Sequence, residues 1–164
     1  MRFLIIIAAF LLASCTDLNI GRNTDAGKKR QFTNETLLGY TPVKHQGSSP
    51  LCWAYAMLAT IETEHIQMGD SVNLSVDYVA RHLLAEQARQ HFLSSGYDRI
   101  TLRGTAPLLL RLISEYGVMP YDSYNAPSLN YKALARRLQT MSETSHDLSQ
   151  LTTRAQRLFD ERIG

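Results

Sequence analysis

The chain has 164 residues, with 17 lysines and arginines, 15 aspartates and glutamates, and a formal net charge of +2. This length suits one domain of ordinary size. Because the charge is nearly balanced and no basic patch recurs with interleaved aromatic residues, the composition gives no support to a nucleic-acid partner.

The amino terminus, MRFLIIIAAFLLASC, has the pattern of a lipoprotein signal peptide. Arg2 supplies a short positive region, and the apolar run from Phe3 to Leu12 is shorter than the roughly 20 residues needed to cross a bilayer. The four residues that end at Cys15, LASC, resemble a bacterial lipobox, in which the cysteine thiol receives a diacylglycerol and the peptide is cut just before it. The alternative is an ordinary signal peptide with Cys15 at or near its cut.

We therefore expect a signal peptide over residues 1–14 and a polar tether over residues 15–31. The protein would be lipid-anchored through Cys15 to a membrane of the bacterial cell envelope, on its periplasmic or surface face. Lipid on Cys15 leaves Cys52, the second of the two cysteines, without a partner in the chain. In an oxidising compartment, such a leftover cysteine indicates either intermolecular pairing or a free reactive thiol.

The spacing of apolar residues predicts a mostly helical chain with very little strand. The first helix starts at Leu51 after Pro50 and ends at Gly69, and the second starts near Ser75, which can cap it, and stops by Gly96. A third helix is expected to begin after residues 104–107 and to end at Tyr116, followed by Gly117 as a left-handed cap. Two amphipathic helices are expected over residues 130–141 and 145–162, with a break at residues 142–144.

Cys52 falls at the beginning of the first predicted helix, where the helix dipole and the free N–H groups favour a thiolate and lower the pKa of a thiol from about 8.5. A thiolate can attack a carbonyl carbon, and the resulting oxyanion then needs hydrogen-bond donors. The backbone N–H of Cys52 and the side-chain amide of Gln46, across a Gly-Ser loop, are the candidate donors. Trp53 and Tyr55 would add apolar walls that limit water.

The stretch PVKHQGSSPLCWAYA resembles the papain-like cysteine peptidases, with the spacing from glutamine to cysteine intact. The resemblance implies that Cys52 is the catalytic nucleophile and Gln46 the oxyanion-hole donor. It extends over residues 41–124, through NLSVDYVARHLL and RGTAPLLLRLISEYGVMPYDSY, and in form is closest to the bleomycin-hydrolase and aminopeptidase branch. Ser49 stands where many members of the family have a disulfide cysteine.

The same resemblance suggests how a substrate would bind. In the family, a glycine pair just before a helix offers backbone groups to an extended peptide. Gly104 takes that position, although Arg103 and Thr105 leave the pair incomplete. Gly104 and Trp53 are the expected substrate-binding residues, and the expected substrate is a peptide or protein.

The implied fold class is mainly α: the helical (left) lobe of a papain-like α+β fold over residues 32–164, with a helical extension from about residue 129 and the β-rich lobe largely absent. The family's catalytic histidine and asparagine follow the nucleophile by about 130–150 residues, which is past Gly164. We therefore expect a carboxy-terminal segment to supply them.

None of the five histidines of the chain is a good substitute for that base. His45 would point away from Gln46 if its loop is extended, and His65 lies about 20 Å along the helix from Cys52 at 1.5 Å per residue. The other three are expected to be solvated surface residues: His82, His91 and His146. No histidine has metal-ligand spacing with a cysteine, so we expect no metal site and no cofactor.

The function expected is that of a papain-like cysteine peptidase, incomplete in this chain, in which thiolate attack by Cys52 gives an acyl-enzyme that water then hydrolyses. The alternative is a lipid-anchored, non-catalytic peptide-binding module derived from a peptidase. A simple helical structural lipoprotein is a third interpretation.

Overall fold

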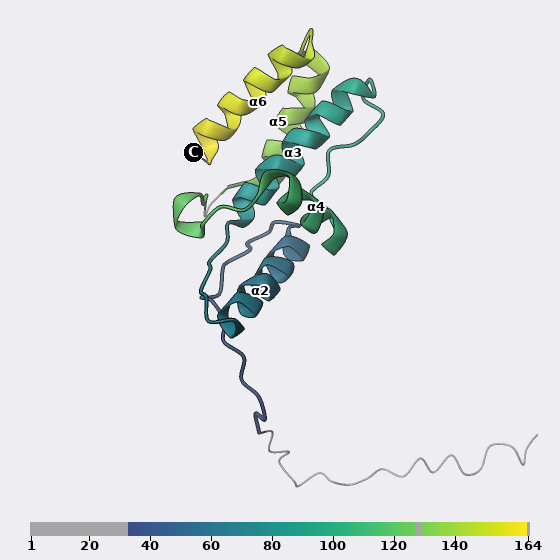
Figure 1. The fold of residues 1–164 in the computed structure, drawn as a ribbon. Helices are drawn as coiled ribbons and strands as arrows, with labels where there is room; N and C mark the ends of the chain where they lie inside the picture. The colour runs from purple at the N-terminus through teal and green to yellow at the C-terminus, as the bar shows by residue number, and fades with distance from the viewer. Residues whose placement is uncertain (1–32, 127–128, 164) are drawn as a thin grey trace, which may run out of the picture. The chain divides into compact units, whose positions relative to one another are not determined.

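A computed structural model describes residues 33–126 and 129–163, and one compact unit begins at Leu37. The signal peptide and tether expected over residues 1–31, Cys15 included, lie outside the described residues. The described part is mainly helical, which confirms the predicted fold class (Figure 1). Its helices are α2 (Cys52–Gln67), α3 (Val76–Leu93), α4 (Ala106–Tyr116), the 3-10 turn η2 (Tyr121–Ser123), α5 (Tyr131–Thr144) and α6 (Leu148–Arg162).

No strand forms among the described residues, and an isolated antiparallel bridge joins Leu74 to Pro120. Two backbone hydrogen bonds of 2.8 Å flank this bridge, from the Ser75 N–H to the Met119 carbonyl and from the Tyr121 N–H to the Asn73 carbonyl. The segment before α3 is therefore fastened to the segment after α4 by main-chain groups.

Helix α3 is the centre of the fold, because it packs against α2, α4, α5 and α6. Its start follows the sequence prediction: Ser75 has an extended backbone, and its side chain accepts a hydrogen bond from the Tyr78 N–H. Buried aliphatic side chains at helical spacing then face the other helices: Val76, Val79, Ala80, Leu83, Leu84 and Ala88. In Figure 1, α5 and α6 lie side by side along one side of α3.

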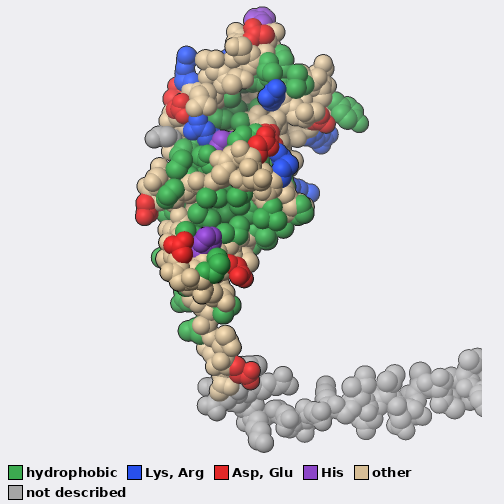
Figure 2. Space-filling view, in the orientation of Figure 1, with side chains coloured by type: hydrophobic (Ala, Val, Ile, Leu, Met, Phe, Trp, Pro, Cys, Tyr) green, Lys and Arg blue, Asp and Glu red, His purple; other side chains and the backbone are tan. Residues whose placement is uncertain are grey.

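Helix α4 ends where the sequence predicts, at Tyr116 before Gly117. Gly117 has φ 77° and ψ −160°, so its φ is positive, but its conformation is more extended than the left-handed cap expected. Its N–H still donates to the Ile113 carbonyl at 2.8 Å. The space-filling view shows hydrophobic side chains gathered on one face in the region of α2 and α4 (Figure 2).

The predicted break between the last two helices is wrong by about one turn. Residues 142–144 belong to α5, where the Ser142 and Thr144 hydroxyls donate to the carbonyls of the preceding turn at Gln139 and Thr140. The chain leaves the helix at Ser145 instead, and Asp147 caps α6 by accepting from the Gln150 N–H at 2.7 Å. Serine and threonine side chains can bond within a helix as well as end one, so composition alone misplaced this break.

Candidate active site

Cys52 is the first residue of α2, and its side chain is a free, exposed thiol. Leu51, fully buried, precedes it as the cap residue, and the Leu51 carbonyl accepts the N–H groups of Ala54 and Tyr55 at 2.9 and 3.1 Å. Among the described residues the backbone N–H of Cys52 donates to no other group. The helix start thus presents a thiol and an open N–H donor together.

The loop that carries Gln46 folds back on itself just before α2. The Gln46 Nε2 donates to the Ser49 carbonyl at 2.6 Å, and the Leu51 N–H donates to the Ser49 hydroxyl at 3.2 Å. Gly47 turns the chain with φ +63°, a value that side chains disfavour. Because an amide nitrogen carries two hydrogens, one N–H donor of Gln46 remains after the bond to Ser49.

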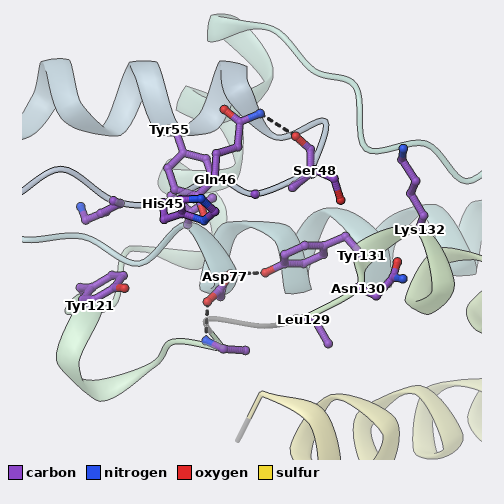
Figure 3. Close-up of a pocket in the computed structure, with 15 residues that line it drawn as sticks. His45, Gln46, Ser48, Tyr55, Asp77, Tyr121, Leu129, Asn130, Tyr131 and Lys132 are labelled. Atoms are coloured by element: carbon purple, nitrogen blue, oxygen red, sulfur yellow. Dashed lines mark hydrogen bonds between the residues drawn. The ribbon is translucent and has the colours of Figure 1, made fainter.

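A cavity of about 340 Å³ opens beside this loop (Figure 3). It lies between residues 44–49, the first turn of α3, η2 and residues 129–132, and Cys52 is not among the residues that line it. Gln46 lies on one side of the cavity, and Asp77 and Tyr131 lie across from it.

Asp77, only 7% exposed, lines this cavity together with two lysines, Lys44 and Lys132. It accepts hydrogen bonds from the Tyr131 hydroxyl and from the Ala126 N–H, the latter at 2.6 Å. Burial, and then the nearby Asp77 charge, raise the pKa of Tyr131 far above its ordinary value of 10.0. The same two causes raise the pKa of Tyr55. Both phenols therefore keep their protons at ordinary pH.

Gly104 and Trp53, the two expected substrate-binding residues, lie against each other. A Cβ built on Gly104 would come within 2.4 Å of the Cε2 and Cζ2 atoms of the Trp53 indole, so only glycine fits there without a shift. The Trp53 Nε1 donates to the Leu102 carbonyl at 2.8 Å. Through these contacts, Trp53 holds the segment before α4 next to the start of α2.

No histidine hydrogen-bonds to Cys52 within the described part of the chain. His45 is exposed at the rim of the cavity, and the Nδ1 atom of His65 lies 3.2 Å from an Asp70 carboxylate oxygen. His65 lies in the last turn of α2, far from Cys52 at the helix start, as the sequence predicts. His146 is exposed, as predicted.

The prediction that His82 and His91 are solvated surface residues is wrong. His91 is 3% exposed and its Nδ1 donates to the Asp98 backbone carbonyl at 2.5 Å, because the turn at Gly96 folds the chain back over the imidazole. His82 is partly buried and stacks on Tyr116 with a centroid distance of 4.2 Å. Burial and the neighbouring Arg81 lower the pKa of His82.

Over residues 33–126 and 129–163, no group of three or more His, Cys, Asp and Glu side chains is arranged to hold a metal ion. In the same residues, no helix has both the length and the apolar character that crossing a membrane requires.

The sequence interpretation missed two buried carboxylates near the site, Glu62 and Asp77. Glu62 follows Ala54 and Leu58 at steps of four residues, so it occupies the apolar face of α2. That position of a carboxylate on a core-facing stripe was a signal that could have identified it. Asp77 lies two residues after the cap Ser75, where a first-turn acid is ordinarily attributed to the helix dipole.

Comparisons with known proteins agree with the sequence motif. No family model matches the chain. A match of 33% identity over 107 residues, 65% of this chain, links it to caricain of Carica papaya, a papain-like cysteine peptidase. The chain spans only 26% of the length of that relative. The match supports a resemblance to papain-like peptidases in general. The closer resemblance to the bleomycin-hydrolase branch stays a prediction. Over about two thirds of its length, this mainly helical chain is similar to a papain-like cysteine peptidase, and its fold is consistent with the helical lobe of that family.

Proposed function

We propose that this chain carries the nucleophile side of a papain-like cysteine peptidase. The observation that supports this most is the exposed Cys52 thiol at the first position of α2, preceded by the turn that holds Gln46. The likeness to caricain supports peptidase chemistry at the level of the family.

In the proposed reaction, the Cys52 thiolate attacks the carbonyl carbon of a peptide bond. A C–S bond forms, and the electron pair of the carbonyl moves onto its oxygen. The Cys52 N–H and the remaining N–H of Gln46 then donate to this oxyanion. Collapse of the intermediate expels the amine, which takes a proton from the imidazolium that had accepted the thiol proton, and leaves an acyl-enzyme that water hydrolyses.

The imidazole and its orienting asparagine are proposed to come from a carboxy-terminal segment, as the resemblance implies. Gly104 is proposed to pair with an extended substrate through its backbone, whose N–H and carbonyl make no hydrogen bond among the described residues. Trp53 would contribute indirectly, because its indole holds that backbone beside α2. The lipid on Cys15 is proposed to keep the protein at the bacterial envelope.

Alkylation of Cys52 tests the activated thiol. The experiment uses the full chain with Cys15→Ser, so that Cys52 is the single thiol, and measures the rate of iodoacetamide modification from pH 5 to 10 by mass spectrometry. We expect modification at neutral pH to be faster than that of a free-cysteine peptide, because the helix start stabilises the thiolate. A rate no higher than the peptide's at every pH would contradict the proposal.

A second candidate is the non-catalytic peptide-binding module. The cavity beside Gln46 favours it, because Cys52 does not line that cavity. The two candidates differ in what Cys52→Ser does. Peptide binding of unchanged affinity in Cys52→Ser, with alkylation of Cys52 in the parent no faster than that of a free-cysteine peptide, would support the module.

A further inference from the structure

A buried carboxylate, Glu62, connects the core of α2 to the segment that leads into the Gln46 loop. Glu62 is 1% exposed, yet each of its carboxylate oxygens has partners. Its Oε2 accepts from the Thr41 hydroxyl at 2.5 Å. Its Oε1 accepts from the Lys44 ammonium and, at 2.6 Å, from the Leu74 N–H.

Lys44 is also largely enclosed. Its side chain is 11% exposed, and its ammonium lies 5.4 Å from the centre of the Tyr121 ring as well as against Glu62. An ammonium with little access to water depends on such partners. Glu62 therefore fixes the point on the side of α2 against which Lys44 lies.

The spacing along the chain gives this ion pair a consequence for the site. Glu62 lies ten residues after Cys52 on one helix, about 15 Å at 1.5 Å per residue. Lys44 is bound next to Glu62, so residues 45–50 must run back along α2 to the buried Leu51 at the helix start. Gln46 lies on this return segment, which is attached at Lys44 on one side and at Leu51 on the other.

We propose that Glu62 is a positioning residue for the oxyanion hole: by holding Lys44 and Thr41, it fixes the segment from which Gln46 reaches the start of α2. This rests on the proposed function, since it assigns Gln46 the role of oxyanion donor. A buried ion pair is weak support for stability by itself, because well-packed apolar residues often serve as well. What the pair supplies is a defined register between residues 41–44 and α2.

The test separates a reaction that forms an oxyanion from one that does not. Addition of the Cys52 thiolate to a peptide aldehyde forms a C–S bond and places the charge on oxygen, which Gln46 would stabilise. Alkylation by iodoacetamide displaces iodide and forms no oxyanion. The chain has a single tryptophan, Trp53 beside Cys52, so aldehyde affinity can be followed by its fluorescence while alkylation is followed by mass spectrometry.

Glu62→Gln and Lys44→Met break the pair from either side, and Lys44→Arg restores a cation. Glu64→Gln is the matched control, because Glu64 is exposed on the same helix. All variants carry Cys15→Ser. Removing an oxyanion donor costs about 10²–10³ in rate, so a displaced donor should weaken aldehyde affinity by about tenfold or more. We expect this loss in Glu62→Gln and Lys44→Met, alkylation rates within about twofold of the parent, and recovery in Lys44→Arg.

Other results overturn the proposal. Unchanged aldehyde affinity in both variants would show that the pair does not position Gln46. Aldehyde affinity and alkylation that fall together, with loss of the far-ultraviolet circular dichroism signal, would make the pair a general support of the fold. If Glu62→Gln fails to fold, Lys44→Met decides. Gln46→Ala identifies a failure of the proposed function instead, because aldehyde affinity that does not depend on Gln46 removes the oxyanion role itself.

Discussion

At the scale of single residues, the best-defined contact of the candidate site is that between Gly104 and Trp53. The indole occupies the place of the missing Cβ, so backbone and ring lie in direct contact. The sequence indicates both residues through the family motif, but not that they touch. It could not show this contact because the two residues lie 51 positions apart (104 − 53) and only the packing of α4 on α2 brings them together.

Gly104→Ala should therefore displace the segment before α4. A Cβ 2.4 Å from ring atoms cannot be accommodated without a shift, and we expect a loss of about 1–3 kcal/mol in the free energy of unfolding, as for overpacked sites. Urea denaturation followed by far-ultraviolet circular dichroism measures it. Thr105→Ala, at the exposed neighbouring position, is the control. A Trp53→Leu background should relieve the cost, and full additivity of the two substitutions would contradict direct contact.

The phenol of Tyr131 gives a prediction about alkaline pH. Its pKa is raised in the folded protein, by burial first and by Asp77 second, so the folded state keeps this proton after the unfolded chain has lost it. Stability is then fully present below pH 10 and falls as the pH rises above that value. Tyr131→Phe should flatten this part of the profile. It should also cost about 1–3 kcal/mol at pH 7, because Asp77 loses a donor.

Denaturation curves at several pH values between 7 and 11.5 check this prediction. Tyr97→Phe is a suitable control because Tyr97 is 88% exposed and its hydroxyl makes no hydrogen bond to a described residue. If Tyr131→Phe and the parent chain lose stability in parallel above pH 10, the link between Tyr131 and Asp77 contributes nothing to the alkaline response.

At the scale of helices, the local sequence predicts where helices start and end better than it predicts which side chains touch. The starts of α2 and α3 and the end of α4 follow from Pro50, Ser75 and Gly117, since capping and turn preferences act within a few residues. The break between α5 and α6 was misplaced because Ser142 and Thr144 had two local options, and the structure takes the intrahelical one.

The caps of α3 and α6, Ser75 and Asp147, should differ in their contribution to the free energy of unfolding. Asp147→Ala removes one exposed hydrogen bond to the Gln150 N–H, for a typical cost of about 1 kcal/mol. Ser75→Ala should cost more, because Ser75 is 2% exposed and its hydroxyl also donates to the Tyr124 carbonyl. That carbonyl would be left without its partner.

Urea denaturation of the two variants measures the difference, with Ser149→Ala in the exposed first turn of α6 as control. Equal costs for Ser75→Ala and Asp147→Ala would mean that the Tyr124 hydrogen bond adds nothing to the cap.

At the scale of the whole molecule, the sequence predicts the fold class and the order of the helices, because helical periodicity is a local property. It does not predict which charges become buried. Glu62 and His91 are ordinary surface residue types, and their burial depends on the Lys44 and Asp98 partners that tertiary packing supplies. The motif around Cys52 is the exception: a short stretch carries both nucleophile and candidate donor.

The proposed lipid anchor would make the location of the molecule depend on one atom, the Cys15 sulfur. Expressed in a bacterium, the full chain should fractionate with membranes and carry a diacylglycerol mass on Cys15. Cys15→Ser should release it, because a single substitution removes the acceptor of the lipid. Cys52→Ser is the matched control and should leave fractionation unchanged. Membrane association that persists in Cys15→Ser would exclude the anchor.

The bridge between Leu74 and Pro120 sets a limit on how this chain can change over evolution. It joins two residues that lie 46 positions apart (120 − 74), and the loop between them contains α3 and α4. The bonds that flank it come from main-chain N–H and carbonyl groups. Main-chain groups are the same for every residue except proline, which lacks the N–H. The bonds that flank the bridge therefore exclude proline at positions 75 and 121. At position 75 the side chain is restricted as well, because the buried Ser75 hydroxyl caps α3 and donates to the Tyr124 carbonyl.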